Sequence, residues 1–163
     1  MSILSWLKEV TTGDNKAGFI DTDSMTFAKE EVEFHGLDMK AALDAHVAWT
    51  KRLEDKLSGS NDEELDVATV ASDCECTLGK WLHGTAQNKF GESPDYEELR
   101  QVHADFHLKA GDILNNVLHG EKDSAINNLK ELRFQSGKVQ LSLVRLYSHA
   151  QHKVLTGRPC GAP

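Results

Sequence analysis

The sequence of 163 residues has few of the features that mark membrane, secreted or nucleic-acid-binding proteins. No apolar run approaches the roughly 20 residues needed to cross a bilayer, and Glu9 interrupts the short apolar start too early for a secretory signal. Basic residues are outnumbered, 18 Lys and Arg against 26 Asp and Glu, and they do not cluster, so we expect neither a nucleic-acid nor a membrane partner. This composition predicts a cytoplasmic globular protein.

Cysteine is also scarce. The three cysteines, Cys74, Cys76 and Cys160, are odd in number and too few for a disulfide framework, and a cytoplasmic setting would keep them reduced. They are therefore candidates for metal or redox chemistry. Histidine, in contrast, occurs eight times, and this count is the feature of the composition that most strongly indicates a site.

Proline occurs only three times, and no segment has the period-2 alternation of a half-buried strand. Apolar residues recur instead in steps of three and four, which is typical of helices that pack in a bundle. The helices predicted in this way cover about 23–57, 62–70, 94–118 and 125–150, with a short turn over 76–82. We therefore predict an all-α fold, a four-helix bundle with a short extra helical turn that carries Cys76.

The chain divides into three predicted regions. Residues 1–24 form an N-terminal extension of loop and short helix, 25–155 form the helical bundle, and 156–163 form a disordered tail. Within the bundle, Asp73 is the expected N-cap of the cysteine-bearing turn, and Gly84 is expected to end it.

Two histidines occupy seam positions where Leu or Ile would ordinarily lie. They are His46 and His103. A polar imidazole at such a position needs a partner, because an unsatisfied buried polar group costs on the order of 1 to 3 kcal/mol. His107 follows His103 by four residues, so both imidazoles project from one face of a helix. A third imidazole from His46 and a thiolate from Cys76 would complete a tetrahedral set that suits zinc. The alternative is that these imidazoles are ordinary core residues, which is our interpretation of His35.

Three motifs around these residues resemble the chemoreceptor zinc-binding domain, abbreviated CZB. The run from Cys76 to Leu82, Cys-Thr-Leu-Gly-Lys-Trp-Leu, resembles the Cys-x-Leu/Phe-Gly-x-Trp signature of that family. His46-Val-Ala-Trp resembles its His-x-x-Trp element, and His103-Ala-Asp-Phe-His resembles its His-x-x-Phe-His element. The intervals between the motifs, 30 and 27 residues, are similar to the spacing in the family.

This resemblance implies a helical bundle that binds one zinc ion per subunit through three histidines and one cysteine, commonly as a homodimer. Carried over to this sequence, the ligands are His46, Cys76, His103 and His107. Members of the family are usually fused to bacterial chemoreceptors or diguanylate cyclases and adjust their output in response to zinc or to oxidants such as hypochlorous acid. Since 163 residues leave no room for such an output domain, we expect this chain to signal through a separate chemoreceptor or diguanylate cyclase, through its own dimer, or not at all.

The expected site favours a regulatory role over an enzymatic one, because four protein ligands leave no open position on zinc for a substrate. A purely structural zinc in a dimeric adaptor is the first alternative. The second is a di-iron bundle, which needs inward-facing Glu or Asp ligands that the seams do not carry. Asp73 and Asp105 are candidates to accept the second N–H of a ligand imidazole.

Overall fold

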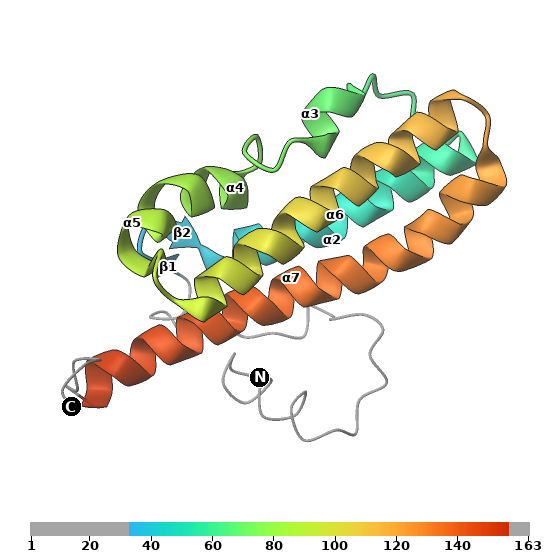
Figure 1. Cartoon of the computed structure of the whole chain (residues 1–163). Coiled ribbons are helices and arrows are strands. Elements are labelled where there is room, and N and C mark those ends of the chain that lie inside the picture. The colour runs from blue at the N-terminus through green and yellow to red at the C-terminus, as the bar shows by residue number, and fades with distance from the viewer. Residues whose placement is uncertain (1–32, 157–163) are drawn as a thin grey trace.

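The computed structural model describes residues 33–156 (Figure 1). Three long helices lie side by side: α2 (Met39–Ser58), α6 (Pro94–Leu118) and α7 (Lys122–Thr156). Between α2 and α6 the chain forms four short helical segments, α3 (Val67–Ala71), α4 (Thr77–Trp81), the π-helical η2 (Leu82–Ala86) and α5 (Gln87–Phe90). The prediction of an all-α bundle is confirmed, with the fourth element broken into short pieces. The predicted extension over 1–24 and most of the predicted tail lie outside the described residues.

The core lies between the three long helices, and α7 packs against both α6 and α2. Apolar residues of all three long helices are buried there, among them Leu53 of α2, Ile113 of α6 and Leu143 of α7, none of which is exposed. Each such side chain contributes about 2 kcal/mol by leaving water. The long helices therefore have an apolar core of their own. No helix in the described part of the chain is long and apolar enough to cross a membrane.

The predicted start of the first helix is wrong. A short hairpin precedes α2, in which β1 (Glu33–Phe34) pairs antiparallel with β2 (Leu37–Asp38). His35 and Gly36 form the turn, both with positive φ (49° and 86°), as a two-residue type I′ turn requires. The backbone at His35 therefore cannot belong to a helix, and its side chain is not a seam residue. The helix begins after Asp38, which caps it by accepting a hydrogen bond from the backbone N–H of Ala41 (2.9 Å).

The short helix predicted over 62–70 forms only at its end, as α3. Asp66 is the N-cap of α3, and its side chain accepts a hydrogen bond from the backbone N–H of Thr69 (2.8 Å). The ends of α6 agree better with the prediction. Pro94 occupies the start of α6, and Gly120, with φ 77°, follows its end.

Two details of the cysteine-bearing turn differ from the prediction. Cys76 itself, not Asp73, is the N-cap of α4, because its Sγ accepts the backbone N–H of Gly79 (3.2 Å). Gly84 does not end the turn, because it lies inside η2 and the chain remains helical through Phe90. The cysteine is thus attached to a continuous run of short helices on the side of α6 (Figure 1).

Candidate metal centre

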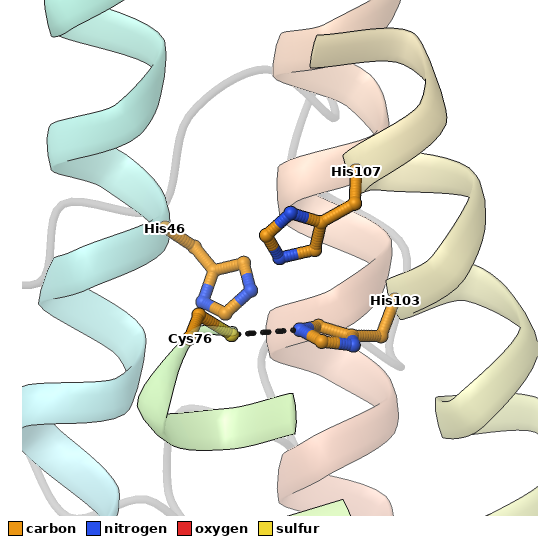
Figure 2. A group of neighbouring side chains, drawn as sticks. All are labelled: His46, Cys76, His103 and His107. Atoms are coloured by element: carbon orange, nitrogen blue, oxygen red, sulfur yellow. Dashed lines mark hydrogen bonds between the residues drawn. The ribbon is translucent and has the colours of Figure 1, made fainter. Parts of the chain in front are cut away.

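Four potential metal ligands from three elements converge at one point of the bundle (Figure 2). His46 comes from the middle of α2, His103 and His107 come from successive turns of α6, and Cys76 comes from the N-terminus of α4. One ligand atom from each residue lies within 4.8 Å of the others. The structure therefore brings together all four residues that the sequence singled out.

The three imidazoles are buried. His46, His103 and His107 are 2%, 0% and 3% exposed, while Cys76 is half-buried. The ring of His103 lies 4.7 Å from that of His107 and 5.3 Å from that of His46, between centroids, and Phe106 lies 5.1 Å from His46. Cys76 is therefore the most accessible of the four candidate ligands.

Backbone carbonyls fix the orientation of two of these rings. Nδ1–H of His46 donates to the carbonyl of Ala42, and Nδ1–H of His107 donates to the carbonyl of Val70, both at 2.8 Å. Because a carbonyl can only accept, each Nδ1 carries the proton and each Nε2 keeps its lone pair. A ligand imidazole is ordinarily held in this way through its second nitrogen.

The carboxylates suggested for this role lie elsewhere. Asp73 pairs with His83 (2.9 Å), and Asp105 accepts from Gln101 (3.0 Å), so neither is bonded to a ligand imidazole. A backbone carbonyl carries no side-chain signature, so sequence patterns alone do not identify the acceptors at Ala42 and Val70.

Several ring nitrogens at the centre have no partner. Among the described residues, Nε2 of His46, Nε2 of His107 and Nδ1 of His103 are buried without a hydrogen bond. Such orphaned groups are costly and rare in folded proteins. The two Nε2 atoms are explained if their lone pairs bind a cation.

Cys76 and His103 form the closest pair. Sγ of Cys76 lies 3.2 Å from Nε2 of His103. Tetrahedral zinc, with bonds of about 2.3 Å to sulfur and 2.0 Å to nitrogen, places such atoms about 3.5 Å apart. The pair therefore already has nearly the separation that a shared zinc ion requires.

The electrostatics of the centre favour the states that zinc needs in its imidazole ligands. Burial lowers the pKa of His46 to about 4 and, together with the neighbouring imidazoles, that of His103 to about 2. Burial also lowers the pKa of His107, against the hydrogen bond to Val70. All three are neutral at pH 7 and can donate a lone pair. Burial raises the pKa of the Cys76 thiol despite the opposing backbone N–H of Gly79, so the thiol must lose its proton when a metal binds.

Close packing holds the cysteine turn in place. A Cβ atom on Gly79 would lie 1.7 Å from the carbonyl oxygen of Asp73, so only glycine permits this approach. Two residues further on, Trp81 donates its Nε1–H to the carbonyl of His35 (3.1 Å), and its ring packs on Phe34. The hairpin before α2 thus braces the turn that presents Cys76.

The remaining histidines and cysteines lie apart from this centre. Cys74 is exposed and is not one of the four converging residues, and His119 and His149 are exposed on the surface. His83 is exposed as well, but it pairs with Asp73. Cys160 lies outside the described residues.

The geometry defines a class of site: a closed centre of three neutral imidazoles and one cysteine in a helical bundle, which is the ligand chemistry of a protein-bound zinc ion. Comparison with known families agrees. Residues 46–114 match the family model of the chemoreceptor zinc-binding domain, CZB. The match begins at His46 and includes all four candidate ligands. No curated protein and no solved structure matches the chain.

Proposed function

We propose that this chain is a zinc-dependent regulatory module in which His46, Cys76, His103 and His107 hold one zinc ion and release of the Cys76 ligand is the signal. The observation that carries the proposal is the set of buried imidazoles whose Nε2 lone pairs lie unpartnered beside a thiol. When bound, zinc supplies the positive charge that keeps Cys76 as a thiolate at neutral pH.

A regulatory role fits the ligand count better than an enzymatic one. Four protein ligands fill a tetrahedral zinc and leave no position for water or substrate, which is the arrangement of non-catalytic sites. We therefore propose that the chain is not an enzyme. The described residues around the imidazoles include no carboxylate among the converging ligands, so a di-iron centre is not favoured.

Cys76 is the ligand through which an oxidant would act. It is half-buried, whereas the three histidines are almost completely enclosed. In the proposed reaction, its thiolate sulfur gives two electrons to hypochlorous acid and gains the oxygen as a sulfenic acid, and chloride leaves. The oxidised sulfur is a poorer ligand, and the N–H of Gly79 loses its thiolate acceptor. Zinc itself is the alternative stimulus, through filling and emptying of the same site.

The structural alternative predicts a different response to zinc removal. The apolar core between α2, α6 and α7 does not depend on the four ligands, so we propose that the long helices remain folded and that the cysteine turn changes. If zinc removal instead abolishes the helical circular dichroism signal, the ion is structural.

We take the proposed partners from the family whose model residues 46–114 match. We propose a homodimer that acts on a separate bacterial chemoreceptor or diguanylate cyclase in the cytoplasm. The net charge of -8 suits a basic docking face on such a partner.

The deciding experiment is elemental analysis after removal of loosely bound metal, with a size measurement on the same samples. We expect about one zinc per chain in the wild type and in Cys74→Ala, the matched control, and much less in Cys76→Ala and His103→Ala. Absence of zinc from the wild type, or retention of zinc in both ligand variants, would refute the proposal. Treatment of the wild type with one equivalent of hypochlorous acid should then release zinc, and an unchanged zinc content would refute the oxidant branch.

A further inference from the structure

A second group of potential metal ligands lies on the outer side of the cysteine turn. It consists of Asp73, Cys74 and His83, with one ligand atom from each within 4.8 Å of the others. Cys74 and His83 are exposed, and Asp73 is half-buried. We propose that these three residues bind a second zinc ion, more weakly than the buried centre does. This site is independent of the function proposed above.

The three residues offer the ligand types that zinc accepts: a carboxylate oxygen, a thiolate sulfur and an imidazole nitrogen. A carboxylate and a thiolate together carry two negative charges, which match a divalent cation. Tetrahedral zinc spaces such atoms about 3.3 to 3.6 Å apart. Nε2 of His83 already lies 2.9 Å from Oδ2 of Asp73, and the exposed Cys74 side chain can approach without repacking the core.

The backbone around this group is fixed by packing. The carbonyl of Asp73 lies against the Cα of Gly79, where any Cβ would be 1.7 Å from its oxygen. His83 lies in the π-helical segment η2, which continues directly from α4, and single π-helical turns occur frequently at functional sites. Two segments ten residues apart in the sequence are therefore held at a fixed separation, so a metal has little chain to order when it binds.

The alternative explanation is that His83 and Asp73 form only a surface ion pair. Such pairs contribute 0 to about 1 kcal/mol and need no third partner. The surface pair does not account for the Cys74 side chain, whose only described hydrogen-bonding neighbour is the Ser72 hydroxyl at 3.4 Å. Three protein ligands would leave one position on the ion open to water, which is why we expect weaker and faster-exchanging binding than at the closed centre.

The test is a zinc titration of the whole chain by equilibrium dialysis up to excess zinc. We expect the wild type to bind two zinc ions in two affinity classes, and His83→Gln and Cys74→Ser each to lose only the weaker one. His119→Gln, which changes an exposed histidine outside the cluster, is the matched control and should still bind two, as should Cys160→Ser.

A second readout identifies the ligand atoms. With Co²⁺ in place of zinc, the second equivalent should add thiolate-to-cobalt absorption in the wild type and none in Cys74→Ser. Saturation of the wild type at one zinc that His83→Gln and Cys74→Ser both keep, or two zinc ions in both of these variants, would overturn the inference. Loss of only the tight class in Cys76→Ala would support two separate sites. If the wild type instead binds only one zinc ion, weakly, and His83→Gln and Cys74→Ser each lose it, the result counts against the regulatory centre and supports this surface site.

Discussion

Substitution of Gly79 tests whether close packing of the cysteine turn, and not only the ligand residues, determines zinc binding. In Gly79→Ala the new Cβ would be 1.7 Å from the carbonyl oxygen of Asp73 and 3.1 Å from the Cα of Cys74. Contacts of Cβ atoms below 3.0 Å are essentially never seen, so the two segments must separate by more than 1 Å. Both segments flank Cys76, and metal sites tolerate distance errors of only about 0.2 Å.

We therefore expect Gly79→Ala to weaken zinc binding about 100-fold or more, because removal of a supporting interaction alone costs 10- to 100-fold in other sites. Overpacking should also lower the free energy of unfolding by about 1 to 3 kcal/mol. The assay is competition for zinc with a chromophoric chelator, together with circular dichroism to confirm that the long helices persist.

The matched control is Gly84→Ala in η2, where a Cβ would meet nothing within 4 Å. It should bind zinc as the wild type does, since it lies in the same run of short helices but has room for the methyl group. If Gly79→Ala remained folded and bound zinc within about threefold of Gly84→Ala, the argument that this close approach positions the thiolate would be wrong.

Three further results are expected. Metal-free protein should lose about 2 kcal/mol of unfolding free energy through His46 alone when the pH falls from 7.5 to 5. The pKa of His46 is about 4 in the folded chain and 6.5 in the unfolded chain, so protonation in this range favours the unfolded chain. Urea titrations that show no loss would contradict this. In Gly111→Ala the new Cβ would lie 2.7 Å from the Cβ of Ala71, so α3 should shift and zinc affinity should fall about tenfold. The double variant that also carries Ala71→Gly should recover the affinity, and no recovery would argue against the steric cause. Trp81→Phe removes the hydrogen bond to the carbonyl of His35 and should lower stability by about 1 kcal/mol or more, and an unchanged thermal midpoint would show that the bond does not contribute.

Much of the fold can be predicted from the periodicity of the sequence. Apolar steps of three and four predicted the long helices, and Pro94 and Gly120 marked the ends of α6. The hairpin before α2 was missed because His35 and Met39 fit the helical steps of three and four, although the apolar residues Phe34 and Leu37 lie on either side of the turn. Gly36 was the contrary signal, since its positive φ makes a turn between the two apolar residues.

The sequence predicted the ligand side chains of the candidate site, but not the contacts that hold these side chains in position. Polar residues at seam positions stand out in a sequence, so His46 and His103 could be found. The acceptor for His46 is a backbone carbonyl, which every residue has and no pattern marks. Cys76 was not expected as a helix cap, because cysteine is not one of the preferred N-cap residues. The contact between Trp81 and His35 joins residues far apart in the chain and depends on the tertiary structure.

The longest helix takes no part in the candidate metal centre. All four converging ligands of the described chain come from α2, α4 and α6, while α7 packs against both α2 and α6 (Figure 1) and contributes Val139 and Leu143 to the apolar core. The packing of α7 therefore does not depend on the candidate ligands, whereas the position of Cys76 would depend on the proposed zinc ion. If loss of the proposed zinc ion moved Cys76, α7 would keep its apolar contacts with α2 and α6, and the change would be confined to the side of the bundle that carries the cysteine turn.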